Sequence, residues 1–243
     1  YGEPGKGEKL VEGLVIAILM VMLVIAIWVM YAKSAYLRLA MKANAAFMKR
    51  FRRLDDLVPF DRIEGIDAKE RALIEKAPLK ALYDVGMEEL EHRKGMQIKK
   101  KGLSAETIEA MRASVDAEQV FQNEKLDKWM VLLTIAISGG PFIGLLGTVL
   151  GVMLVFGEVA AAGDVNINAI APGIAAALLA TVAGLGVAIP SLFGYNYLNA
   201  QVVTIANEMR VFVDRLITRL AETHHHMNPP QQPLSGDLPQ AAE

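Results

Sequence analysis

The sequence predicts an all-α integral membrane protein with three transmembrane helices and long helical extensions on the cytoplasmic side. Three observations predict this class. The chain is 53% hydrophobic, and its mean hydropathy of +0.32 is high for a chain of 243 residues. Its apolar residues gather in three runs that lack charged side chains, at residues 14–32, 129–157 and 165–207. Each run is long enough for the roughly 20 residues that cross the hydrocarbon core of a bilayer.

The first run is rich in Leu, Ile, Val and Met on all sides, and Trp28 and Tyr31 at its end are typical interfacial anchors. It lacks small residues, so we expect it to face lipid. The next region keeps apolar residues at helical spacing, with breaks predicted at Pro59, Gly65 and Pro78. In chain order the predicted segments are an outer tail (1–13), a transmembrane helix (14–32), a cytoplasmic helical region (33–128), a second transmembrane helix (129–157), an outer loop (158–168), a third transmembrane helix (169–200), a cytoplasmic helix (201–223) and a disordered tail (224–243).

Basic residues near the ends of the runs predict the orientation. The connection between the second and third runs carries Glu158 and Asp164 but no Lys or Arg. Basic residues accumulate at the other ends of the runs, and such residues mark the cytoplasmic side. We therefore expect the N-terminus outside and the C-terminus in the cytoplasm. The basic residues are Lys33, Arg38, Lys42, Lys49, Arg50, Arg52, Arg53, Lys125, Lys128, Arg210 and Arg215.

Small residues recur on one side of the second and third runs. In the second run their spacing forms a doubled Gly-x-x-x-Gly pattern, which lets two helices approach closely in a membrane. The third run carries a second stripe of small residues. We expect both stripes to pack helices around a partner. Their members are Gly140, Pro141, Gly144, Gly147 and Gly151 in the second run, and Pro172, Gly173, Ala177, Gly184 and Pro190 in the third.

Two hydroxyls, those of Thr148 and Thr181, lie deep in these runs. Their simplest interpretation is a hydrogen bond to the carbonyl one turn earlier in the same helix. The alternative is that they line an ion pathway. Pro141 and Pro190 each remove a backbone donor inside an apolar helix, whereas Pro172 is expected at a helix start, where the missing N–H costs nothing.

The runs contain no Asp, Glu or His, although an ion relay across a membrane generally needs such groups at depth. A titrating carboxylate must therefore come from another chain if ions are moved. The sequence contains no Cys, no acid pair and no metal-ligand cluster, so we expect no enzymatic activity, no cofactor and no metal. The His224–His226 group is interpreted as part of a solvated tail. No nucleic-acid partner is expected.

Two long motifs resemble those of the ExbB/TolQ/MotA proton-channel family, with ExbB the closest and MotA more distant. Residues 141–151 read PFIGLLGTVLG and resemble the motif of the family's second span. Residues 171–181 read APGIAAALLAT and resemble the motif of its third span. The likeness is strong over about residues 125–200. In the first span and the cytoplasmic region, the chain resembles the family only in the order of its segments.

The resemblance implies a homopentamer in the bacterial inner membrane, with a dimer of a single-span ExbD- or TolR-like partner inside its pore. The partner carries an Asp in its span, and proton flow past this Asp drives rotation. The family's pathway threonines fall on Thr148 and Thr181. The implied function is an ExbB-like subunit that uses the proton motive force to energise TonB-dependent transport across the outer membrane, with a TonB-like protein as a further partner.

The sequence departs from the family at Ala176, where relatives usually have Glu. We therefore include Ala176 with Thr148 and Thr181 as candidate pore-lining residues, and the departure argues against a proton relay on the third span. Alternatives are a TolQ-like or gliding-type motor subunit, or a structural scaffold that conducts no ions. An autonomous channel is disfavoured by the absence of a polar ring in the spans.

Overall fold

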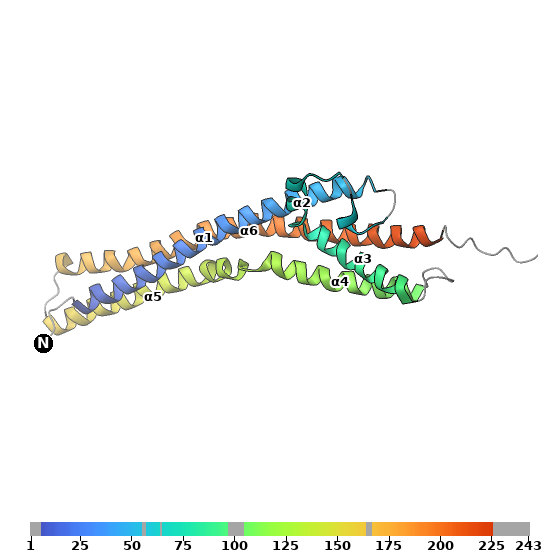
Figure 1. Cartoon of the computed structure of the whole chain (residues 1–243). Coiled ribbons are helices and arrows are strands. Elements are labelled where there is room, and N and C mark those ends of the chain that lie inside the picture. The colour runs from blue at the N-terminus through green and yellow to red at the C-terminus, as the bar shows by residue number, and fades with distance from the viewer. Residues whose placement is uncertain (1–5, 55–56, 64, 97–104, 164–166, 226–243) are drawn as a thin grey trace, which may run out of the picture. The chain divides into compact units, whose positions relative to one another are not determined.

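A computed structural model describes residues 6–54, 57–63, 65–96, 105–163 and 167–225 (Figure 1). The described residues form helices and connections and contain no strand, which confirms the all-α class. Three of the helices are long and apolar enough to cross a membrane. The elements are α1 (Lys6–Phe51), the 3-10 helix η1 (Phe60–Arg62), α2 (Ala68–Ile74), α3 (Pro78–Met96), α4 (Ala105–Asp127), α5 (Met130–Ala162) and α6 (Ile167–His225).

Several helices extend beyond the predicted segments. α1 begins at Lys6, within the segment predicted as an outer tail, so residues 6–13 of this helix precede the predicted transmembrane segment. α5 continues to Ala162 and α6 begins at Ile167, so the two helices take up most of the predicted loop 158–168. α6 also continues to His225, and the remainder of the predicted tail 224–243 lies outside the described residues.

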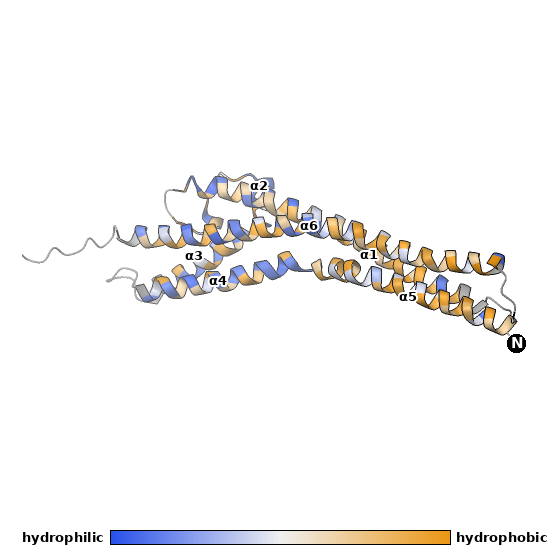
Figure 2. Ribbon diagram, turned by 180° about the vertical axis from the view of Figure 1, so that it is seen from behind, coloured by the Kyte–Doolittle hydropathy of each residue, from blue (hydrophilic) through white to orange (hydrophobic). Residues whose placement is uncertain are grey.

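The chain divides into two compact units. Unit 1 comprises Tyr1–Lys42 and Phe121–Asn207, and unit 2 comprises Ala43–Val120 and Glu208–Glu243. The long helices α1, α4 and α6 contribute residues to both units, whereas α5 belongs to unit 1 and α2 and α3 belong to unit 2. Figure 2 shows that α5 is hydrophobic along most of its length and that α4 is largely hydrophilic.

In unit 1, α1, α5 and α6 run side by side (Figure 1). α1 buries Val15, Leu19, Ala26 and Val29, which recur at helical spacing on one side. Its other sides expose large apolar residues. The exposed side chains include Leu14, Ile18, Val21, Val24 and Ile25. One side of this helix therefore packs within unit 1, and the remaining apolar side chains are exposed.

The junction between α4 and α5 lies in unit 1 and contains Trp129, the only non-glycine residue of positive φ, at 73°, among the residues described. A left-handed backbone is unfavourable for a bulky side chain. Lys33 of α1 stabilises this junction, because its ammonium donates hydrogen bonds to the carbonyls of Lys125 (3.2 Å) and Lys128 (2.8 Å). A cation is favourable at the C-terminal end of a helix, where carbonyls lack intrahelical partners.

Unit 2 is built around an aromatic cluster. Phe47 and Phe51 of α1 pack against Phe212 of α6, with ring centroids 5.6 and 5.1 Å apart in edge-to-face arrangements. Tyr83 of α3 and Phe60 of η1 complete the cluster. The Tyr83 hydroxyl donates to the carbonyl of Val58 (2.6 Å), so its polar end is satisfied although the side chain is fully buried.

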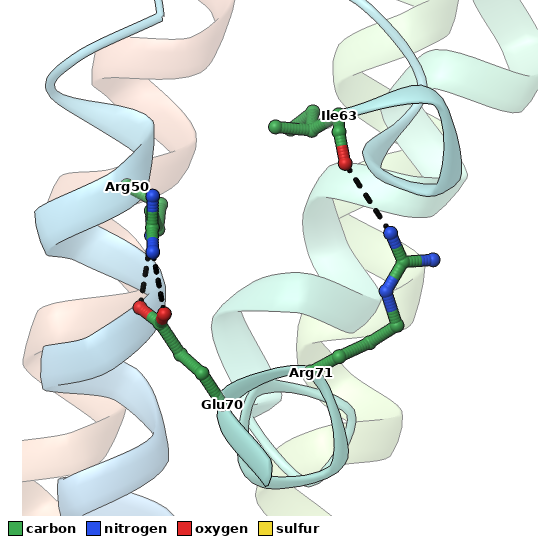
Figure 3. Close-up of polar contacts among 4 residues, drawn as sticks. All are labelled: Arg50, Ile63, Glu70 and Arg71. Atoms are coloured by element: carbon green, nitrogen blue, oxygen red, sulfur yellow. Dashed lines mark hydrogen bonds and ion pairs between the residues drawn. The ribbon is translucent and has the colours of Figure 1, made fainter. Parts of the chain in front are cut away.

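Polar side chains join the short helices of unit 2 to α1. The buried Asn44 side chain accepts a hydrogen bond from the backbone N–H of Leu79 (3.3 Å), in the first turn of α3. Arg50 makes a two-pronged ion pair with Glu70 of α2, with N–O distances of 2.9 and 2.5 Å (Figure 3). On the far side of α2, Arg71 donates to the carbonyl of Ile63 (3.2 Å). These contacts fix the connection between α1 and α3.

Candidate ion-pathway site between α5 and α6

The two stripes of small residues predicted from the sequence pack against each other. A Cβ atom placed on Gly140 would lie 2.8 Å from the carbonyl oxygen of Gly184. One placed on Gly151 would lie 2.7 Å from the Cβ of Ala177. Both distances are too short for a real side chain, so the helices are in direct backbone contact at one end of the stripe and separated by a single methyl group at the other. This is the close approach that small residues allow in membrane helices.

α1 closes the same contact from a second direction. A Cβ atom on Gly147 would lie 2.7 Å from Ala180 and 3.0 Å from Val15 of α1. Gly139 lies near Met22 of α1 in the same way, at 3.3 Å. The glycines of α5 therefore allow close contact with both α6 and α1. Sequence reasoning missed the role of α1 here, although the helical spacing of Val15 and Leu19 is a signal for it.

Thr148 and Thr181 face each other across this contact, with their hydroxyl oxygens 3.5 Å apart. The Thr148 hydroxyl donates to the carbonyl of Leu145 (2.7 Å), one turn earlier in α5, as its simplest interpretation predicted. That interpretation is wrong for Thr181, whose hydroxyl donates across the interface to the carbonyl of Gly144 (3.2 Å).

The physical reason lies in Gly144. A Cβ atom on this residue would lie 3.0 Å from the Cα of Thr181 and 2.9 Å from the carbonyl oxygen of Ala180. Without that atom, the backbones approach so closely that the Gly144 carbonyl is within reach of the α6 hydroxyl. The glycine pattern and the threonine are thus parts of one arrangement, which spacing within a single helix could not reveal.

All three prolines of the stripes lie inside helices, Pro141 in α5 and Pro172 and Pro190 in α6. The prediction that Pro172 begins a helix is wrong, because α6 begins at Ile167. Each proline removes one backbone N–H and so frees the carbonyl four residues earlier. In membrane helices such carbonyls are satisfied by neighbouring helices, hydroxyls or water.

Ala176 and Gly173 are both half-buried, and Ala177 is buried against Gly151. Ala176 therefore lies next to a residue of the helix contact, but its own side chain remains partly exposed. A methyl group at this position offers no hydrogen bond and no charge. The first hydroxyl-bearing residue after Ala176 in α6 is Thr181.

A buried polar residue of α6 also escaped the sequence prediction. Ser191 of α6 is fully buried, and its hydroxyl donates to the carbonyl of Val187 (2.7 Å) in the same helix. Its position next to Pro190 is the only sequence signal that could have indicated it. Because this bond lies within α6, Ser191 contributes to the packing of this helix. It donates no hydrogen bond to Thr148 or Thr181.

The site holds hydroxyls and backbone carbonyls but no Asp, Glu, Lys, Arg or His between residues 129 and 157 of α5 or along residues 167–207 of α6. A threonine hydroxyl both donates and accepts hydrogen bonds, but it does not titrate in the physiological range. The site can therefore orient water, an ion or a carboxyl group. It cannot itself store a proton in an acidic side chain.

Fold and site together define an all-helical membrane protein whose second and third spans meet along small residues with a threonine pair between them. Residues 77–211 match the MotA/TolQ/ExbB proton channel family. A Tol-Pal system protein TolQ from Haemophilus influenzae is 31% identical over 213 residues, which cover 87% of this chain and 90% of the relative. The chain belongs to this family, which confirms the resemblance of the two motifs.

Relatives of two names match most of the chain. A TolQ from Pseudomonas aeruginosa is 30% identical over 77% of this chain and 78% of its own length. A biopolymer transport protein ExbB from Neisseria meningitidis serogroup A is 27% identical over 84% of this chain and 89% of its own length. The family is thus established, and the likeness does not separate its ExbB and TolQ branches.

Proposed function

We propose that this chain is the ring-forming subunit of an ion-driven motor in the bacterial inner membrane. The observation that carries the proposal is the Thr148–Thr181 pair, held where α5 and α6 touch through Gly144. Membership of a proton-channel family supports it. In this proposal the hydroxyls hydrogen-bond to water or to a carboxyl group as protons pass, and the glycines and prolines form the walls.

The carboxyl group belongs to a second protein in this proposal. The spans of this chain lack acidic residues, and Ala176 offers none, so the third span does not relay protons itself. A single-span ExbD- or TolR-like partner supplies an Asp within its span. A homopentamer of this chain surrounds a dimer of that partner. The exposed apolar residues of α5 and α6, such as Phe142 and Phe193, are available to contact neighbouring copies and lipid.

A more specific part of the proposal concerns which machine this motor drives. We infer an ExbB-like role, in which the motor energises TonB-dependent transport across the outer membrane through a TonB-like protein. A TolQ-like role is supported to the same degree by the relatives from Haemophilus influenzae and Pseudomonas aeruginosa. Copurification from the native membrane separates the two, because an ExbD-like partner with a TonB-like protein supports the first and a TolR-like partner supports the second.

The test of ion drive is Thr181→Val, which keeps the shape of the side chain and removes the hydroxyl. We expect partner-dependent proton flux in proteoliposomes to fall to background, because the bond to Gly144 and the polar surface are lost together. Thr204→Val is the matched control on α6, since that hydroxyl is exposed and donates to the carbonyl of Ala200 (2.9 Å) in its own helix. Full flux in Thr181→Val would refute the proposed pathway.

A structural scaffold without ion conduction is the second candidate. The observation that favours it is Ala176, which leaves the third span without the acidic group that the family resemblance implies. The two candidates differ in one measurement. Proton flux in proteoliposomes that contain this chain and its partner supports the motor. Its absence, in a preparation where the complex is intact, supports the scaffold.

A further inference from the structure

Unit 1 contains a cavity of about 320 Å³ beside the junction of α4 and α5. It lies between the end of the apolar run of α1 and the residues on either side of Trp129. Its volume falls within the range of about 300–1,000 Å³ that is typical of ligand pockets. The lining residues are Trp28, Val29, Ala32, Lys33, Tyr36, Lys125, Lys128 and Trp129.

The lining combines an apolar wall with positive charge. Trp28 and Trp129 meet edge to face with ring centroids 6.3 Å apart, and both are partly exposed. Three lysines line the cavity, and none of its lining residues is acidic. Tryptophans and lysines together are typical of the boundary between a membrane and the cytoplasm.

The three lysines have different tasks. The Lys33 ammonium is occupied by the carbonyls of Lys125 and Lys128 and also interacts with Asp127. The Lys125 ammonium lies 4.1 Å from the centre of the Phe121 ring, and the Lys128 ammonium lies 5.6 Å from that of Trp129. A cation that rests on a ring face keeps N–H groups free for an anion. Glu124 and Asp127 are the acidic neighbours in sequence.

We propose that this cavity binds one anionic phospholipid. An acyl chain fills the apolar part beside Trp28, Val29 and Ala32, and the phosphate meets the ammonium groups of Lys125 and Lys128. Basic residues near an anionic leaflet attract such lipids by about 1 kcal/mol each. The choice of the cytoplasmic leaflet, unlike the lipid class, rests on the orientation proposed for this chain.

The two tryptophans make the proposal directly testable. The chain contains two in total, and both line the cavity, so its intrinsic fluorescence reports on this place. The full chain is reconstituted in vesicles with either brominated phosphatidylglycerol or brominated phosphatidylcholine at equal mole fraction. We expect stronger quenching by the anionic lipid, because bromine in a bound chain lies next to the indole rings.

Lys125→Gln and Lys128→Gln test the charge. We expect each substitution to reduce the preference for the anionic lipid by about fivefold, the equivalent of about 1 kcal/mol per lysine. The matched control removes the same charge from exposed positions of unit 2, as Lys69→Gln with Lys76→Gln, and should leave the preference unchanged. Ala32→Phe retains every lysine but fills the cavity, so quenching by either brominated chain should fall while circular dichroism stays the same.

Equal quenching by the two lipids in the unchanged chain would overturn the proposal, as would a preference that survives loss of both lysines. Competition by glycerol phosphate or inorganic phosphate would overturn it in favour of a soluble phosphate ligand. The measurement needs neither a partner protein nor a proton gradient. Its failure is therefore distinguishable from a failure of the motor proposal, which is measured as flux.

Discussion

Gly184 and Gly186 are two glycines of α6 with different surroundings, and they offer a matched test of the helix contact. A Cβ atom on Gly184 would collide with the carbonyl of Gly140, whereas one on Gly186 would meet nothing within 4 Å. We expect Gly184→Ala to lower the free energy of unfolding by about 1–3 kcal/mol, since the backbones must separate. Gly186→Ala should be neutral or stabilising by up to about 1 kcal/mol.

Denaturant unfolding of the purified chain in detergent, followed by circular dichroism, measures both variants. Equal effects of the two substitutions would contradict the assignment of Gly184 to the contact. The comparison also separates packing from helix propensity, because both substitutions replace glycine by alanine in the same helix.

For individual residues, the sequence predicted the positions of the packing surface more accurately than the atoms that each residue contacts. The spacing of Gly140, Gly144, Gly147 and Gly151 indicated a packing surface, and the structure has one there. It could not indicate that Thr181 bonds to Gly144, because the periodicity of one helix carries no information about the rotation of its neighbour. The hydrogen bonds of Lys33 to the carbonyls of Lys125 and Lys128 could not be predicted either, because they also join different helices.

Among the elements, α1 and α2 are joined by the ion pair of Arg50 with Glu70. The hydrogen bonds from the Arg50 guanidinium lower the pKa of the Glu70 carboxyl below its ordinary value of 4.5. A group whose pKa is lowered in the folded state contributes stability above its unfolded pKa and loses it as pH falls through the folded pKa. The contribution of this pair is therefore present at neutral pH and disappears in acid.

Glu70→Gln should accordingly lower the thermal midpoint at neutral pH, and the two unfolding curves should converge as pH falls below 4.5. Thermal unfolding in detergent across this range measures the difference. Glu109→Gln, at an exposed position of α4, is the control and should run parallel to the unchanged chain at every pH. A constant gap between Glu70→Gln and the unchanged chain would contradict the linkage.

The helices themselves were largely predictable, and their ends were not. Uncharged runs predicted the apolar parts of α1, α5 and α6, and Pro78 marks the first residue of α3. The break before α5 falls on Trp129 with a left-handed backbone, which no local preference of Trp suggests. It is supported by Lys33 from a different helix, so a tertiary contact decides where the element begins.

For the whole molecule, the proposed orientation places the two ends of the chain on opposite sides of the membrane. The chain contains no Cys, so single introduced cysteines report their side without background. Glu158→Cys near the end of α5 should react with a membrane-impermeant maleimide in intact cells. Lys69→Cys on α2 should react only after the inner membrane is permeabilised, because the positive-inside rule predicts that unit 2 lies in the cytoplasm.

Labelling of Lys69→Cys from outside would contradict this orientation. A further exposed position of unit 2, Lys76→Cys on the connection after α2, serves as the second reporter for the same side. Labelling of both positions from outside would indicate a reversed orientation. Labelling of one position alone would indicate local leakage of the reagent.

The backbone contact between Gly140 and Gly184 also limits how this chain can evolve. Where two facing side chains touch, a larger residue on one helix can be accommodated when a smaller one arises on the other. Here both positions already have the smallest residue, so no second substitution can make room. We therefore expect substitutions to drift in compensating pairs at Gly151 and Ala177, where a methyl group remains to be exchanged, while Gly140 and Gly184 stay fixed.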